Sequence, residues 1–241
     1  MSIHLVGGGW SPAQTTAVFG PFLDEATAGA ARESAEATSI VVLLVGGDSP
    51  EENDYADRYR ALLRDGDGFA VTITRVSPGQ TFESTHLAGA HGLVIGGGTT
   101  PDYLAAVQPI AGEIRRLAAS GLPYLGFSAG AAIAAERALV GGWRIGDVPV
   151  CAEDAGEGLD DVAVEAGLGL VDLTIEVHAA QWGTLARLLA ATEAGLVDGG
   201  VAIDEDTAFV VGEQGLRVEG AGNVWSVRRT EDGVLVRTLG A

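Results

Sequence analysis

The stretch SIVVLLVGG, residues 39–47, is an almost unbroken apolar run that ends in a glycine pair. Two more segments share this pattern, IHLVGGG at 3–9 and GLVIGGG at 92–98. Near-continuous apolar runs rich in β-branched residues are typical of parallel strands in a sheet that is covered on both faces. Helical patterns occur at 52–64 and 101–119. The alternation predicts an α/β fold with a doubly wound, mainly parallel sheet and helices on both faces.

The rest of the chain extends this pattern. Further strands are expected at 70–76, 123–127, 173–177 and 200–204. The tail 207–239 has glycine turns and predicts a C-terminal antiparallel hairpin extension. The 241 residues fit one α/β domain over 1–241. The acidic, glycine-rich segment 138–166 is expected to be a long loop near the site, which in such sheets lies at the carboxyl ends of the strands.

Composition excludes several classes of function. The net charge of 14 − 33 = −19 repels phosphate backbones and anionic lipids, so we expect neither a nucleic-acid partner nor a membrane partner. All basic residues are arginine, which excludes Schiff-base, Ser–Lys and P-loop chemistry. Cys151 is the single cysteine, so no intramolecular disulfide can form, and we expect a cytoplasmic protein without a signal peptide or spanning helix. The histidines and the cysteine lack ligand spacing, so neither a metal nor a cofactor is expected.

The glycine clusters do not fit a dinucleotide site. Pro12 and Pro101 stand where the third glycine of G-x-G-x-x-G would allow close helix packing. For Gly7–Gly9 and Gly46–Gly47, we expect tight turns between a strand and a helix.

The predicted strand PYLGF, 123–127, runs directly into Ser128-Ala129-Gly130 and then into the alanine-rich segment 131–139, which we expect to be helical. This arrangement is typical of a nucleophile elbow, in which Gly126 and Gly130 avoid backbone clashes around an exposed serine hydroxyl. The following amide, that of Ala129, and the helix N-terminus would favour a developing oxyanion. An ordinary serine helix cap is the alternative.

A nucleophilic serine needs a base, and the chain has four histidines. His4 and His91 precede their predicted strands, at the opposite edge of the sheet from Ser128. His86 lies in a weakly patterned stretch with no candidate catalytic residue around it. His178 directly follows the strand 173–177, so it is expected at the same edge as Ser128. The alternative is a histidine that only caps the strand end.

Two acids could orient His178. Glu205 follows the next strand, whereas Asp147 would reach from the long loop. We prefer Glu205 because a strand end orients a base more rigidly than a loop does. Strand alternation places Asp204 and Asp206 on the opposite face, where we expect them to be solvated.

Taken together, GGGTTPDYL (96–104), GFSAGAAI (126–133), DVPV (147–150), VHAAQWGTLARLL (177–189) and AIDEDTA (202–208) resemble one family. It is the serine peptidases that include aspartyl dipeptidase (dipeptidase E) and cyanophycinase, on a scaffold similar to class I glutamine amidotransferases. The resemblance implies Ser128 as nucleophile, His178 as base and Glu205 as acid. It also implies an oxyanion hole from the amides of Ala129 and a glycine of the 96–98 cluster, by preference Gly98.

The resemblance further implies hydrolysis of a peptide or isopeptide bond next to an aspartyl residue in a small peptide substrate. Trp182 and Thr184 depart from the arginines expected after the histidine, which leaves Arg187. We hypothesise that Arg187 binds the substrate carboxylate. A glutamine amidotransferase would need a cysteine in the elbow, where this chain has Ser128. The alternative to an enzyme is a catalytically silent binding module on the same scaffold. A homodimer is compatible with the sequence.

Overall fold

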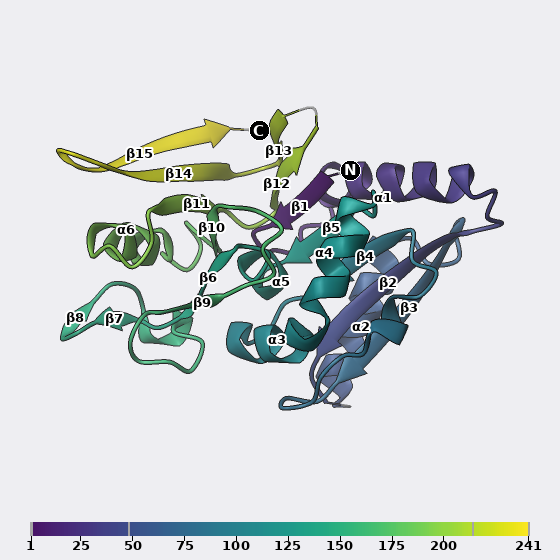
Figure 1. Ribbon diagram of the computed structural model, residues 1–241, viewed down its shortest axis with the longest axis horizontal. Helices are drawn as coiled ribbons and strands as arrows, with labels where there is room; N and C mark the ends of the chain where they lie inside the picture. Colours follow the sequence, from purple (N-terminus) through teal and green to yellow (C-terminus); the bar gives the residue numbers. More distant parts are fainter. Residues whose placement is uncertain (1, 48, 214, 241) are drawn as a thin grey trace.

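A computed structural model describes residues 2–47, 49–213 and 215–240 (Figure 1). Its two main sheets have seven and four strands, and two further pairs of short strands form separate sheets. The large sheet has seven strands in the order β13-β12-β1-β5-β4-β2-β3. Its strands are β1 (Ser2–Val6), β2 (Thr38–Val45), β3 (Phe69–Val76), β4 (Gly92–Ile95), β5 (Tyr124–Phe127), β12 (Thr207–Gly212) and β13 (Gly215–Gly220). The first five run parallel, while β12 is antiparallel to β1 and β13 to β12. The predicted α/β class with a mainly parallel central sheet is therefore confirmed.

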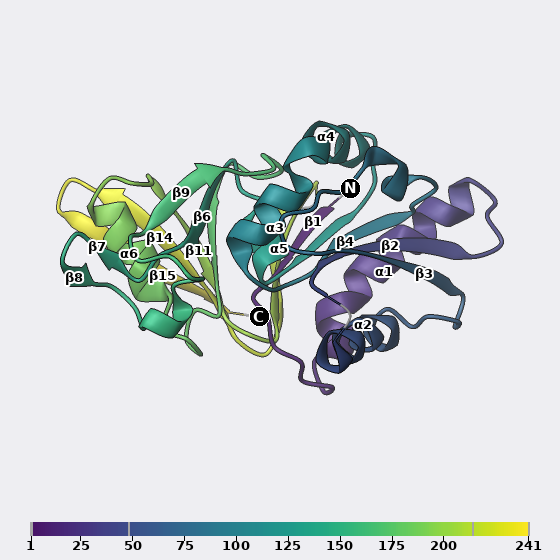
Figure 2. The same cartoon turned by 90° about the horizontal axis from the view of Figure 1, so that it is seen from below.

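Helices cover both faces of the large sheet (Figure 2). They are α1 (Thr15–Arg32), α2 (Pro50–Leu62), α3 (Thr100–Val107), α4 (Ala111–Ala119) and α5 (Ala129–Ala132). Apolar side chains of α1 and α2 pack on one face, and those of α3, α4 and α5 pack on the other. Because both faces are buried, the strands carry the unbroken apolar runs seen in the sequence.

A second, small sheet has the order β10-β11-β14-β15. Its strands are β10 (Thr174–Val177), β11 (Gly199–Ile203), β14 (Asn223–Thr230) and β15 (Gly233–Gly240). α6 (Leu185–Glu193) packs against it around a core of its own. The strands predicted at 173–177 and 200–204 thus exist, but they start a separate sheet instead of extending the large one. The strands of the antiparallel C-terminal tail belong to both sheets: β12 and β13 pair in the large sheet, and β14 and β15 pair in the small one.

Three predicted segments differ from the structure. The helix expected at 101–119 is divided by the 3₁₀ turn η2 (Gln108–Ile110), because Pro109 has no N–H for a continuous helix. The helix expected at 131–139 was wrong beyond Ala132, where α5 ends; β6 (Arg137–Gly141) follows after four intervening residues and pairs with β9 (Ala163–Ala166). The loop expected at 138–166 contains these strands and three short elements, η3 (Glu153–Ala155), β7 (Arg144–Ile145) and β8 (Val148–Pro149).

The remaining short element is η1 (Ser84–Leu87), which contains His86. His91 lies just before β4, as predicted, but His4 was wrongly placed before its strand: it is fully buried inside β1. Among the described residues, no helix combines the length and apolar character that crossing a bilayer requires.

Candidate active site

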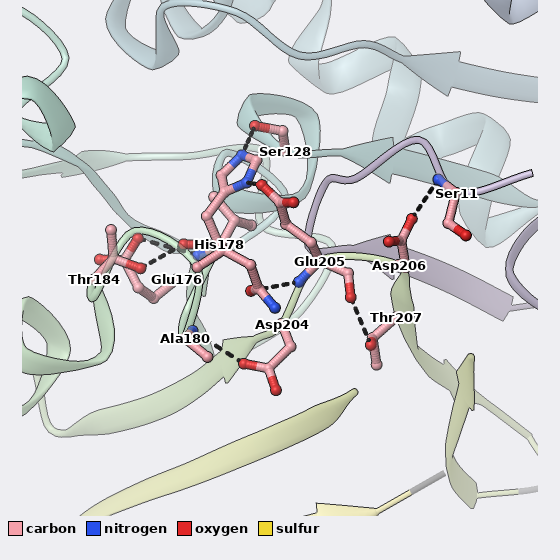
Figure 3. A network of polar contacts seen from close by, with 12 residues as sticks. Ser11, Ser128, Glu176, His178, Ala180, Thr184, Asp204, Glu205, Asp206 and Thr207 are labelled. Carbon is pink, nitrogen blue, oxygen red and sulfur yellow. Dashed lines mark hydrogen bonds and ion pairs between the residues drawn. The ribbon is translucent and has the colours of Figure 1, made fainter. Parts of the chain in front are cut away.

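Ser128 lies on a sharp turn between β5 and α5 (Figure 3). Its backbone has φ 53° and ψ −111°, a conformation that non-glycine residues rarely adopt. A Cβ atom at Gly126 would overlap the carbonyl of Gly130, and one at Gly130 would overlap the carbonyl of Ile95. The two glycines therefore allow the turn for the steric reason expected of a nucleophile elbow.

His178 follows β10 and lies beside the serine. Its Nε2 is 2.8 Å from the Ser128 Oγ, and its Nδ1 is 2.7 Å from the Glu205 Oε1 (Figure 3). When the proton of the neutral ring is on Nδ1, this N–H donates a hydrogen bond to the carboxylate. Nε2 then has a free lone pair that can accept the serine hydroxyl proton. The structure thus brings Ser128, His178 and Glu205 together in one hydrogen-bonded chain.

Burial controls the charge of this histidine. Desolvation lowers the pKa of His178, while the hydrogen bond and the charge of Glu205 act in the opposite direction. The net direction is downward, so the imidazole is held in the neutral form that a general base requires.

The carboxyl end of β1 joins the three site segments. Successive carbonyl oxygens of Val6, Gly7 and Gly8 accept hydrogen bonds from the amides of Ser128 (2.9 Å), His178 (3.0 Å) and Asp206 (2.8 Å), the last being next to Glu205. Gly8 has φ +102°, and a Cβ atom there would overlap the His178 ring. The glycine cluster, predicted only as a tight turn, therefore also sets the space for the imidazole.

The candidate oxyanion donors flank Ser128. Gly98 lines the cleft, and Ala129 is the first residue of α5, where helix amides lack intrahelical acceptors. The amide of the neighbouring Gly97 donates to the hydroxyls of Tyr55 and Tyr59, both at 3.2 Å. Gly97 is therefore occupied, which favours Gly98 as the glycine donor.

The alternative acid, Asp147, is not near the histidine. It lies in the exposed turn between β7 and β8, whereas Glu205 makes the contact with Nδ1.

Asp204 was wrongly expected to be solvated. It is 3% exposed and accepts hydrogen bonds from the amides of Ala180 and Asn223 and from the Trp225 indole. Asp206 is half-buried and accepts from the Ser11 amide at 2.8 Å. Both carboxylates hold backbone segments around the site, Asp204 from a buried position and Asp206 from a half-buried one.

Arg187 does not reach the cleft. Its guanidinium is 4% exposed and pairs through two bonds, of 2.7 and 2.9 Å, with Glu176 on β10. It also donates to the carbonyls of Gly142 and Ala155. Burial alone would lower the pKa of Arg187, but the Glu176 charge raises it overall, so the guanidinium stays charged. The structure therefore contradicts the placement of Arg187 at a substrate carboxylate.

A cleft of about 900 Å³ opens over Ser128 and His178. Aromatic walls come from Trp10, Tyr55, Tyr103, Phe127 and Trp182. Carboxylates are the charged groups of its lining, at Glu52, Asp102, Asp154, Glu157 and Glu205. Among the described lining residues there is no arginine.

Comparison with known proteins identifies the family of this chain. The model of peptidase family S51 matches residues 41–218. This chain belongs to peptidase family S51. Membership supports a serine peptidase, and the S51 match spans the segments that carry Ser128, His178 and Glu205. No protein of curated function matches the sequence significantly.

Solved structures share the S51 fold. A peptidase from an acI-B1 Actinobacterium has a TM-score of 0.66 at 16% identity, with 100% of this chain and 94% of that one covered. A putative peptidase E protein from Listeria monocytogenes EGD-e has a TM-score of 0.53 at 16% identity, with 92% and 98% covered. At this identity the likeness shows the fold alone.

Sequence reasoning missed three features of the site in this S51 chain: the contact of Gly8 with the His178 ring, the contact of Trp182 with the same ring, and Glu157 in the cleft lining. Glu157 lines the cleft, and its Oε2 accepts from the Thr100 amide at 3.1 Å. Burial raises the pKa of Glu157. The run of three glycines after β1 could have indicated that another group approaches the backbone at Gly8. Glu157 had no signal in the sequence beyond its place in an acidic, glycine-rich segment.

Proposed function

We propose that this S51 protein is a serine peptidase that cleaves by a Ser128–His178–Glu205 triad through an acyl-enzyme intermediate. The observation that supports it most is the continuous hydrogen-bonded chain from the serine Oγ to the glutamate carboxylate at the cleft wall. The serine Oγ is 2.8 Å from one imidazole nitrogen, and the glutamate carboxylate is 2.7 Å from the other, which is the arrangement that activates a serine hydroxyl.

In the acylation step, the Ser128 Oγ bonds to the scissile carbonyl carbon while its proton moves to the His178 Nε2. The carbonyl electron pair moves onto oxygen, where the amides of Gly98 and Ala129 would stabilise it. The imidazolium then gives its proton to the leaving amine as the carbon–nitrogen bond breaks. Water activated by the same imidazole hydrolyses the ester and restores the serine.

The family resemblance makes aspartyl and β-aspartyl peptides the first substrate class to consider. Recognition of their free carboxylate by Arg187 has no support, because that guanidinium is engaged with Glu176. Two arginines beside the cleft are also engaged: Arg75 donates to the carbonyls of Gly47 and Glu52, and Arg58 pairs with Asp54.

The lining itself favours a second candidate, short peptides with neutral or cationic side chains. Asp102, Asp154 and Glu157 line the cleft as carboxylates, and an aspartyl carboxylate beside them would be repelled. A peptide ammonium or guanidinium group would be attracted, and the aromatic walls suit a cation as well.

Two experiments test the proposal. Labelling by a fluorophosphonate probe is expected for the wild-type protein and lost in Ser128→Ala, with unchanged circular dichroism. A folded wild-type protein that is not labelled would instead support the silent binding module.

The substrate is tested with dipeptides that differ in one group: Asp-Leu, β-Asp-Leu, Asn-Leu and Lys-Leu. If the protein prefers aspartyl substrates, Asp-Leu or β-Asp-Leu should have the highest kcat/KM. If the acidic lining decides the preference, the kcat/KM values of Asn-Leu and Lys-Leu should exceed that of Asp-Leu. Ser128→Ala serves as the control in every assay, because turnover that survives this change belongs to a contaminant.

A further inference from the structure

Trp182 lies flat against the proposed catalytic base. The ring centroids of Trp182 and His178 are 3.8 Å apart and the ring planes differ by 6°. The indole lines the cleft and is 46% exposed. One of its faces therefore covers the imidazole while part of the side chain stays open to solvent.

The turn that carries Trp182 is held on several sides. The Trp182 amide donates to the His178 carbonyl at 2.9 Å, so a single helical turn brings the indole back over the imidazole. Between them, the Ala180 amide donates to Asp204, and the Gln181 side chain accepts from the Glu205 amide. The stack is thus tied to the strand end that also presents the acid.

This contact matters most when the histidine becomes charged. Acylation converts the neutral imidazole into an imidazolium, and a cation against an aromatic face is stabilised by the π-electrons. The charged groups that face His178 are Glu205 at Nδ1, Glu176 from β10 and Arg187 from α6. Glu176 and Arg187 are paired with each other and largely cancel, so Glu205 and the indole remain as the groups that favour the charged ring.

We propose that Trp182 is a positioning residue that holds the His178 ring in line with Ser128 and stabilises its imidazolium form during acylation. The role rests on the proposed triad, because it supports the base of that triad. The family resemblance would place an arginine at position 182. The charge of an arginine would repel the imidazolium, whereas the indole of Trp182 stabilises it.

A fluorescence titration tests the contact without any substrate. A stacked imidazolium quenches indole emission, so wild-type fluorescence is expected to fall as the pH is lowered through the pKa of His178. His178→Gln and Trp182→Phe are each expected to abolish this step, although Trp10, Trp143 and Trp225 remain in both. A step that survives either change, or is absent from the wild type, would overturn the stack even if the peptidase activity is real.

A matched pair of variants tests the catalytic role. Trp182→Phe keeps an aromatic face, while Trp182→Leu covers the ring with a similar apolar volume but no π-electrons. We expect Leu to lower kcat by roughly 3- to 10-fold relative to Phe, with KM little changed, and to move the acidic limb of kcat/KM down by about 0.5 to 1 pH unit. Equal kcat values and equal pH profiles for the two variants would mean that the indole only covers the site.

Discussion

The large and small sheets contribute to the same cleft in different ways. The large sheet presents Ser128 on a buried turn between a parallel strand and a helix, where backbone atoms pack closely against Gly126 and Gly130 on either side of it. The small sheet presents His178 and Glu205 just beyond the ends of β10 and β11, the carboxylate being about one-quarter exposed. The position of the proposed nucleophile therefore depends on local backbone geometry, whereas the positions of the proposed base and acid depend on how two sheets meet.

The meeting point is the segment after β1. Val6, Gly7 and Gly8 offer consecutive carbonyls to the Ser128, His178 and Asp206 amides, so one short stretch of backbone sets the distances between both halves of the site. A misplacement of 1 Å between reacting groups can cost about 100-fold in rate. The comparison predicts that changes at this junction or on the small sheet reduce activity without unfolding the large sheet.

Replacing the acid should have the largest effect. Glu205→Gln keeps the shape but loses the carboxylate that holds the Nδ1 proton, so kcat is expected to fall by between about 10² and 10⁴. Asp147→Asn is the control, because its side chain lies in an exposed turn and should leave kcat within about twofold. Steady-state kinetics on the best dipeptide would measure both, and a larger loss in Asp147→Asn would reassign the acid.

Breaking the buried pair of the small sheet should have the next largest effect, on stability. Arg187→Met leaves Glu176 as a buried carboxylate without its cation, which is expected to cost about 3–5 kcal/mol of the free energy of unfolding. Arg116→Met, which removes a 62% exposed arginine paired with Glu113, is expected to leave the free energy of unfolding almost unchanged, because water already screens that pair. Urea unfolding measures both values; a similar small loss in each would show that the Arg187 pair is not sealed from water.

What could be predicted from the sequence also differs between the large sheet and the small sheet. The parallel strands, the elbow and the positions of His178 and Glu205 after strand ends could be predicted, because apolar runs and glycines act locally. The separate small sheet and the short α5 could not, since strand pairing is decided by contacts distant in sequence. The partner of Arg187 did leave a signal: Glu176 interrupts the apolar strand LTIEV, and a carboxylate buried there needs a cation.

The junction can be tested at one atom. Gly8→Ala places a methyl group in the space of the His178 ring, so kcat is expected to fall by about 100-fold through displacement of the imidazole. Gly121→Ala is the matched control, because Gly121 has a similar φ of +109° but open space around it, and reports the backbone strain alone. Turnover and fluorophosphonate labelling should fall in Gly8→Ala and stay near the wild-type level in Gly121→Ala, while thermal unfolding shows whether Gly8→Ala is still folded at the assay temperature. Equal activity in both would show that the imidazole does not need the glycine.

The smallest effect concerns the pH profile. Only the neutral His178 can take the serine proton, and burial lowers its pKa below the ordinary value of 6.5, so the acidic limb of kcat/KM is expected to have its midpoint below pH 6.5. Glu205 opposes this shift, because its charge and hydrogen bond favour the imidazolium. In Glu205→Gln that opposition is lost, and the midpoint should move to still lower pH even though the rate falls. Profiles of kcat/KM between pH 4 and 8 at constant ionic strength would show both shifts. A wild-type midpoint above 6.5 would mean that the carboxylate outweighs burial, and an upward shift in the variant would mean that another group titrates in place of His178.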